Sequence, residues 1–188
     1  ASIVPAETTT GAIMILMIFA CLEPTSVMTE VIPYGDPDIE VLSYDCDPST
    51  ARWTFEATTD KTTPVSLTNH SYFNLAGYGS VLGHQLQLTA DAFLPVNNKV
   101  LPTGVIAPVT GTPFDFTRAR ALGEQIAHED EQLKIGSGYD HNFVARADCQ
   151  DLSTPFAVVT DPESGRILKV FTDSPGVQLY SGNFLGAT

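Results

Sequence analysis

Cysteine is scarce in this sequence, and its three cysteines, Cys21, Cys46 and Cys149, lie far apart. None belongs to a Cys-x-x-Cys pair, so the spacing excludes the common structural zinc motifs. An odd number of cysteines without regular spacing also argues against a framework of disulfide bonds. We therefore expect reduced cysteines and a cytoplasmic protein.

Basic residues are also few. Nine lysines and arginines stand against 22 aspartates and glutamates, which gives a formal net charge of −13. Nucleic acids and anionic membranes are themselves negative and do not attract a chain of this charge. The composition argues against both partners and favours a neutral small molecule. Hydrophobic residues make up 43% of the chain, which is typical of a folded domain rather than a disordered one.

No hydrophobic run is long enough to span a bilayer, which requires about 20 residues. The longest run, residues 12–22, has eleven apolar residues, and the first basic residue of the chain, Arg52, comes well after it. A signal peptide would begin with positive charge. The run favours a buried strand or helix. A cryptic targeting segment, or an N-terminus foreign to the ancestral protein, stays open as an alternative.

Helical periodicity is nearly absent, and 13 prolines and 14 glycines interrupt the chain. Alternating apolar and polar residues predict strands over residues 39–45, 52–57, 64–70, 84–90, 156–160, 167–172 and 177–181. Residues 92–116 predict an ordered loop, and residues 119–128 alone predict a short helix. The pattern indicates an all-β protein, an antiparallel β-sandwich.

Polar and aromatic residues concentrate in patches over residues 68–77, 102–104, 110–116, 138–143 and 176–185. Planar polar side chains hydrogen-bond to adjacent sugar hydroxyls, and aromatic faces cover the C–H face of the ring. His70 carries an imidazole, a group that transfers protons near neutral pH. Asp140 can accept from two neighbouring hydroxyls. Spacing alone also allows a structural role for His70 and turn-forming roles for Asp140 and Asn183.

The same patches resemble the aldose 1-epimerase (galactose mutarotase) family. The segment TNHSYFNLAG, residues 68–77, is similar to the family signature around its catalytic histidine. Three further blocks match in the right order, with the landmarks GTPFDF, GYDHNFV and PGVQLYSGNFL. The resemblance covers roughly residues 39–185. It implies the supersandwich fold of galactose mutarotases, with residues 39–188 as a partial domain, incomplete at both ends, and residues 1–38 as an unassigned segment.

The resemblance implies a role for each matching residue. By position, His70 resembles the general acid that protonates the ring oxygen. Asp140 resembles the carboxylate that holds sugar hydroxyls, and Gln178 resembles a further substrate contact. Ser71 and Tyr72 are expected to shape the same pocket.

Other polar residues near these motifs are expected to have lesser roles. His141 and Asn142 are interpreted as support, and His84 and His128 as surface residues. The implied reaction interconverts the α and β anomers of a free aldohexose, such as galactose or glucose, by acid and base catalysis. It requires no cofactor and no metal, and the resemblance implies a monomer.

The sequence also departs from the family pattern. The family's general base is a glutamate beyond the SGNFL corner, and the printed sequence ends three residues after Leu185. An upstream arginine and a second histidine also lack counterparts, because no histidine precedes His70, and Arg52, the first arginine, lies in a different motif. Losing a general base lowers a rate about 10²–10⁴-fold, so we expect weak or no mutarotation by this polypeptide.

Two other functions stay open. The first alternative is a degenerate, non-catalytic carbohydrate-binding homologue that holds sugars through Asp140 and Gln178. The second is an epimerase of phosphorylated hexoses, which the sparse basic residues disfavour because a phosphate site requires clustered arginine or lysine.

Overall fold

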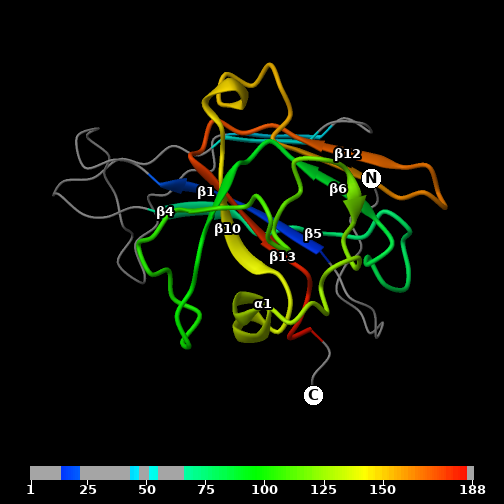
Figure 1. Ribbon diagram of the computed structural model, residues 1–188. Helices are drawn as coiled ribbons and strands as arrows, with labels where there is room; N and C mark the ends of the chain where they lie inside the picture. The colour runs from blue at the N-terminus through cyan, green and yellow to red at the C-terminus, as the bar shows by residue number, and fades with distance from the viewer. Residues whose placement is uncertain (1–13, 22–42, 47–50, 55–65, 186–188) are drawn as a thin grey trace, which may run out of the picture.

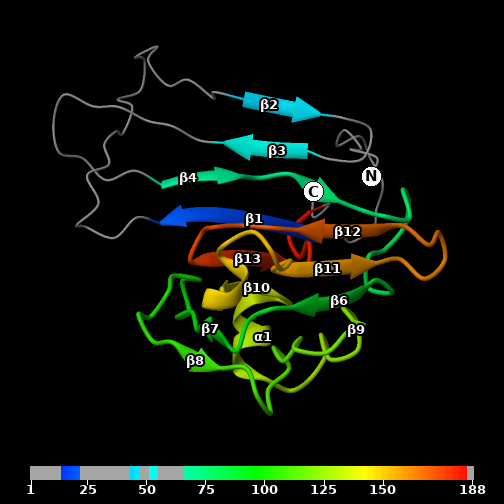
Figure 2. The same cartoon turned by 90° about the horizontal axis from the view of Figure 1, so that it is seen from above.

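A computed structural model describes residues 14–21, 43–46, 51–54 and 66–185 of the chain. Within these ranges, short antiparallel strands dominate, and helical structure is confined to one α-helix and one 3₁₀ turn, Ala147–Cys149. Figures 1 and 2 show two sheets stacked face to face. The prediction of an all-β sandwich is confirmed.

The larger sheet has seven strands. Its order is β4-β1-β13-β10-β7-β8, and β5 also pairs with β1, next to β4. All of its strand pairs are antiparallel. The strands are β1 (Met14–Cys21), β4 (Ser66–Asn69), β5 (Tyr72–Phe73), β7 (Ala92–Leu94), β8 (Ala107–Pro108), β10 (Asp140–Val144) and β13 (Gly176–Tyr180).

The smaller sheet has four strands in the order β12-β11-β6-β9. It consists of β6 (Gln85–Leu88), β9 (Arg120–Ala121), β11 (Ala157–Thr160) and β12 (Ile167–Val170). A separate two-stranded ladder joins β2 (Ser43–Cys46) and β3 (Ala51–Thr54).

The core lies between the two sheets and follows from strand alternation. In β6, Leu86 and Leu88 are buried while Gln87 between them is exposed, since successive side chains of a strand point to opposite faces. The larger sheet contributes buried side chains in the same way, and Phe93 stacks on Phe114 with ring centroids 4.3 Å apart. Burying such aromatic faces supplies much of the hydrophobic stabilisation of a domain of this size.

Residues 14–21 of the apolar run form β1, inside the larger sheet, where it pairs with β13 on one side and with β4 and β5 on the other; residues 12, 13 and 22 lie outside the described ranges. The strand interpretation of this run is confirmed. The division of the chain at residue 38 stays a prediction. In the part of the chain that the structure describes, no helix has the length and apolar character needed to cross a membrane.

The predicted helix over residues 119–128 is wrong, because this segment contains β9 and turns. Gly123 packs so closely that a Cβ there would lie 2.9 Å from Cβ of Leu82, and its N–H donates to the Leu82 carbonyl. Pairing of β9 with β6 therefore overrides the local helical propensity.

Helix α1 (Glu131–Gly136) follows this segment instead. The Asp130 side chain caps its first turn by accepting from the N–H groups of Gln132 and Leu133, at 2.8 and 3.2 Å. The segment around Asp140, which carried no strand prediction, forms β10 directly after it.

His141 lies on the core face of β10 and is fully buried. Its ring meets those of Phe93 and Phe114 edge-on, and Nδ1 accepts the backbone N–H of Asp140 at 3.1 Å. Burial lowers the pKa of His141 to about 4, with Asp130 opposing the shift. This supports the expectation that His141 is a supporting residue.

Acid should destabilise the fold through His141. The unfolded side chain takes up its proton near pH 6.5 and the folded one near pH 4, so the unfolded state binds more protons between these values. The free energy of unfolding should therefore fall by a few kcal/mol across this window. Buried His84, whose pKa is also lowered, adds a loss of the same sign. Urea denaturation against pH should show a weaker dependence for His141→Phe, while the exposed-site control His128→Phe should match the parent.

Candidate active site

Strand register gathers polar side chains on the outer face of the larger sheet. Asp140 of β10 pairs with Tyr180 of β13, and Asn142 pairs with Gln178. Residues two apart share a face of a strand, so these four side chains point to the same side. Their neighbours His141 and Leu179 point into the core and are fully buried, whereas Asp140, Asn142 and Gln178 are half-buried.

Asp140 and Gln178 form a hydrogen-bonded pair. Gln178 Nε2 donates to Asp140 Oδ1 at 2.8 Å. Burial raises the pKa of Asp140, and the bond from Gln178 opposes that rise. The described contacts leave Asp140 Oδ2 open, so one ligand hydroxyl can donate to this carboxylate. A second hydroxyl can donate to, or accept from, the Gln178 amide.

Tyr180 extends this face and was missed by the sequence analysis. Its hydroxyl accepts the Phe184 N–H at 2.7 Å, and the two rings stack with centroids 6.3 Å apart. Burial raises the pKa of Tyr180, with the negative charge of Asp140 and then Tyr72 adding to the rise. The available signal was the spacing of two between Gln178 and Tyr180, which places both side chains on one face of a strand.

The predicted acid lies beside β5, on the other side of β1 from β13. Tyr72 of β5 pairs with Ile15 of β1, which pairs in turn with Tyr180. His70 lies just before β5, is exposed, and has its ring centroid 5.4 Å from that of Tyr72. Because β1 lies between β5 and β13, two strand spacings of about 4.8 Å separate them, a span comparable with one sugar ring and its hydroxyls.

Ser71 has a local role in the described contacts. Its backbone N–H donates to Asn69 Oδ1 at 3.0 Å, which shapes the bend between β4 and β5. None of the contacts described for Ser71 joins its hydroxyl to Asp140 or Gln178. The structure thus groups Asp140, Gln178 and Tyr180 tightly, and places Tyr72 and His70 across β1 from them.

The SGNFL corner fixes the start of β10 against the end of β13. Asn183 Nδ2 donates to the carbonyls of Gly136 and Tyr139, at 2.7 and 3.0 Å. The Tyr139 N–H donates to Ser181 Oγ at 3.0 Å. Gly138 has φ 131° and no room for a Cβ, which would collide with the Asn183 side chain. Asn183 is therefore a cross-link beside Asp140 rather than a simple turn residue.

Two histidines interpreted as surface residues differ in the structure. His128 is exposed, as expected. His84 is only 2% exposed, so the surface interpretation of His84 is wrong. Its ring is enclosed beneath the loop that follows β5, where Nε2 accepts a backbone N–H from Leu75.

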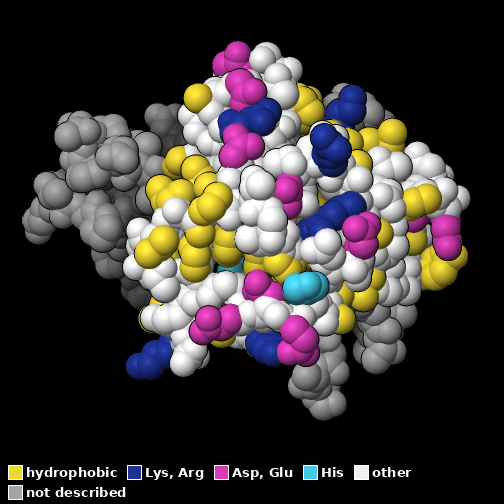
Figure 3. Space-filling model, in the orientation of Figure 1, with side chains coloured by type: hydrophobic (Ala, Val, Ile, Leu, Met, Phe, Trp, Pro, Cys, Tyr) yellow, Lys and Arg dark blue, Asp and Glu magenta, His cyan; other side chains and the backbone are white. Residues whose placement is uncertain are grey.

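A separate open cleft of about 740 Å³ is formed by the segment between residues 110 and 128. It includes Asp115, Arg120 and His128 but none of the residues predicted for the sugar site. On the face of the molecule that Figure 3 presents, Lys and Arg side chains are spread among acidic ones rather than gathered in one patch. Within the described ranges, no group of three or more His, Cys, Asp or Glu side chains could hold a metal ion.

Replacing the Asp140 carboxylate by an amide should stabilise the fold at neutral pH. Because burial raises the pKa of Asp140, its charged form is less favourable in the fold than in the unfolded chain. Asp140→Asn keeps an oxygen for Gln178 and should raise the free energy of unfolding at pH 7, by at most about 1 kcal/mol. The gain should vanish below the unfolded pKa of 3.8, where both states are protonated. Urea denaturation at pH 7 and pH 3.5 measures it, and a loss of stability at pH 7 would contradict the account.

Removing the cross-link at Asn183 should be costly. Asn183→Ala takes a donor from two carbonyls and should lower the free energy of unfolding by about 1–3 kcal/mol. Chemical denaturation should show this loss, while Asn98→Ala, at an exposed asparagine of the β7–β8 connection, should change stability by under about 0.5 kcal/mol. Equal effects of the two substitutions would refute the cross-linking role.

Comparisons with known proteins agree with the four sequence motifs. The family profile described as aldose 1-epimerase matches residues 41–188. Galactose mutarotase of Mus musculus is 47% identical over 136 residues, which cover 71% of this chain and 38% of the relative. Aldose 1-epimerase of Escherichia coli (strain K12) is 43% identical over 136 residues, covering 72% and 39%.

Solved structures give the same result for the fold. The crystal structure of galactose 1-epimerase from Lactobacillus acidophilus NCFM aligns with a TM-score of 0.55 and 34% identity, over 64% of this chain and 33% of that one. The chain thus spans well under half the length of the relatives it matches. The resemblance drawn from the motifs is confirmed, and this chain belongs to the aldose 1-epimerase family.

Proposed function

We propose that this chain binds a free aldohexose on the outer face of the larger sheet and serves in the interconversion of its anomers. The observation that carries this proposal is the Asp140–Gln178 pair, whose hydrogen bond of 2.8 Å orients a half-buried carboxylate. Tyr72 and His70 lie on the other side of β1 from this pair. This arrangement suits a ligand with hydroxyls on one edge and a proton-accepting ring oxygen on the other.

The proposed chemistry is a proton exchange between two groups and the sugar. His70 donates its proton to the ring oxygen while a base removes the proton of the anomeric hydroxyl, and the bond between C1 and the ring oxygen breaks. The open-chain aldehyde rotates about C1–C2. The ring then closes on the other face of the carbonyl, and the two groups exchange roles. Asp140 and Gln178 hold the sugar hydroxyls throughout.

The described cluster supplies the acid and the sugar-orienting pair, and the base is a further requirement. Without general-base assistance, the rate falls about 10²–10⁴-fold. We therefore propose sugar binding as the activity of the described cluster, and mutarotation as a reaction that requires a base as well. A carbohydrate-binding homologue without turnover is the second candidate, favoured by the tight pairing of Asp140 with Gln178 while His70 is exposed.

The remaining assignments follow from the family and from composition. Galactose and glucose are the proposed sugars, and no cofactor or metal is needed for proton transfer of this kind. The net charge of −13 supports a neutral small molecule rather than nucleic acid or membrane as partner. The buried free thiol of Cys149 is compatible with the proposed cytoplasmic location. We propose that the protein acts as a monomer.

Substitutions should separate binding from turnover. Gln178→Leu should weaken galactose affinity at least about tenfold, because it removes a sugar contact and frees the Asp140 carboxylate. His70→Asn should leave affinity within about threefold and remove measurable mutarotation. NMR titration with galactose measures affinity, and exchange spectroscopy between the two anomeric signals measures turnover. His128→Asn is the matched control, since it removes an exposed histidine elsewhere.

The results discriminate among the candidates. Turnover that depends on His70 supports a mutarotase. Binding that depends on Gln178, without turnover above the uncatalysed rate, supports the carbohydrate-binding homologue. Galactose binding unaffected by Gln178→Leu would refute the site proposed here.

A further inference from the structure

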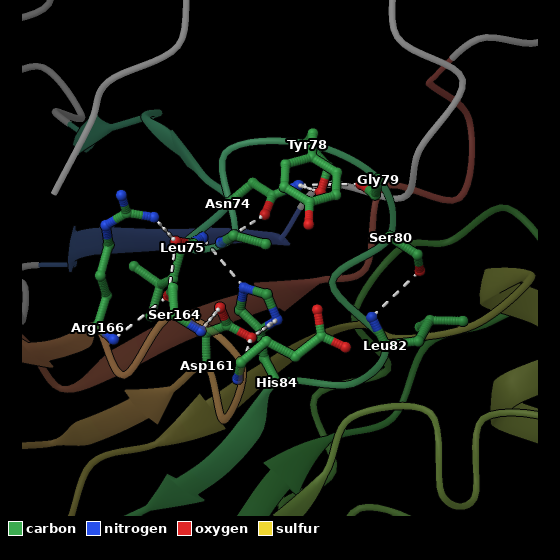
Figure 4. A network of polar contacts seen from close by, with 12 residues as sticks. Asn74, Leu75, Tyr78, Gly79, Ser80, Leu82, His84, Asp161, Ser164 and Arg166 are labelled. Carbon is green, nitrogen blue, oxygen red and sulfur yellow. Dashed lines mark hydrogen bonds and ion pairs between the residues drawn. The ribbon is translucent and has the colours of Figure 1, made fainter.

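The loop between β5 and β6 is anchored at Leu75, three residues after Tyr72. The Leu75 side chain is 3% exposed and belongs to the core. Figure 4 shows its backbone among polar side chains from distant parts of the chain. These contacts matter for the site because β5 has only two residues and so offers few ladder bonds of its own.

Side chains bond to Leu75 at both of its backbone polar groups. Its N–H donates to Nε2 of His84 at 3.0 Å. Its carbonyl accepts from Nη1 of Arg166 at 2.8 Å and from the Ser164 hydroxyl at 3.2 Å. Ser164 and Arg166 belong to the β11–β12 turn of the smaller sheet, so this one residue of the loop is bonded across the two layers.

His84 is held in the state that this bond requires. Because Nε2 accepts a hydrogen bond, it is unprotonated, and the proton lies on Nδ1. Nδ1 is 3.9 Å from Oδ1 of Asp161, which is also buried. Burial lowers the pKa of His84, against the opposing charge of Asp161. The ring is therefore neutral at pH 7 and available as an acceptor.

The β11–β12 turn is itself ordered by Asp161. Its Oδ2 accepts the Ser164 N–H at 2.9 Å, and its own N–H donates to the Arg166 carbonyl at 3.0 Å. The Ser164 and Arg166 side chains thus extend from a turn whose backbone is held by hydrogen bonds to Asp161. In Figure 4, His84 and Asp161 lie on one side of Leu75, and Arg166 approaches it from another.

We propose that His84 is a positioning residue for the proposed acid His70, acting through Leu75, with Ser164 and Arg166 as the second half of the anchor. The inference rests on the proposed function, because it gives His70 its role. A bond at Leu75 restrains the short β5 from its C-terminal side. Pairing of Tyr72 with Ile15 restrains it from the sheet. Together they set where the His70 and Tyr72 rings meet, 5.4 Å apart.

The test compares two substitutions at His84. His84→Leu removes the acceptor, whereas His84→Gln places an amide oxygen near the position of Nε2 and should restore it. NMR reports the exchange rate of the Leu75 amide and the ring resonances of His70, neither of which requires turnover. His128→Leu, which makes the same change at an exposed histidine, is the control.

We expect His84→Leu to speed Leu75 amide exchange about tenfold or more and to shift the His70 ring resonances. His84→Gln should recover most of both effects. Since a general loss of stability would not shift His70 alone, resonances of Phe143 in the core serve as the internal reference. If His70 keeps its parent resonances in folded His84→Leu, the positioning role is overturned.

A second variant keeps the test decisive if His84→Leu fails to fold. Arg166 is exposed, so Arg166→Met removes the bond to the Leu75 carbonyl at little risk to the core. It should shift the His70 ring resonances in the same direction, and unchanged resonances would overturn the inference. If the variants show these NMR effects but the parent protein neither binds nor converts galactose, the proposed function alone is refuted.

Discussion

Antiparallel pairing between β10 and β13 sets which side chains meet on each face of the larger sheet. In the observed register, Asp140 lies beside Tyr180 and Asn142 beside Gln178. A slip of one residue would turn Asp140 into the aromatic core and His141 out of it, since side chains alternate along a strand. The buried face resists that slip, because it would exchange Phe143 for polar side chains in the core.

Several local features agree with this register. The Asp130 cap begins α1, the helix that precedes β10, and the bonds of Asn183 join the start of β10 to the corner after β13. Each acts on backbone rather than on the sugar-facing side chains. The two sides of the proposed pocket are therefore positioned by different means, the Asp140 side by a cross-linked corner and the His70 side by a loop anchored on the smaller sheet.

The sequence was informative where the signal was local and failed where it depended on distant contacts. Alternation predicted most strands and the sandwich, and linear motifs singled out His70, Asp140 and Gln178 as candidate site residues. The helix expected over residues 119–128 was wrong because pairing with β6 overrode it. His84 was taken for a surface residue because nothing in its sequence neighbourhood reveals Asp161, some 80 residues later, whose carboxylate lies 3.9 Å from its ring.

The position of β1 gives the proposed pocket a fixed width. The strands that carry the acid side and the sugar-orienting side are never direct neighbours, and β1 pairs with both. Their separation is thus a whole number of strand spacings, and it cannot be adjusted finely by substitutions within either strand. Selection among the proposed sugars on such a frame must come from side-chain length and from the loops at its rim, while β1 acts as a spacer between the two sides of the proposed site.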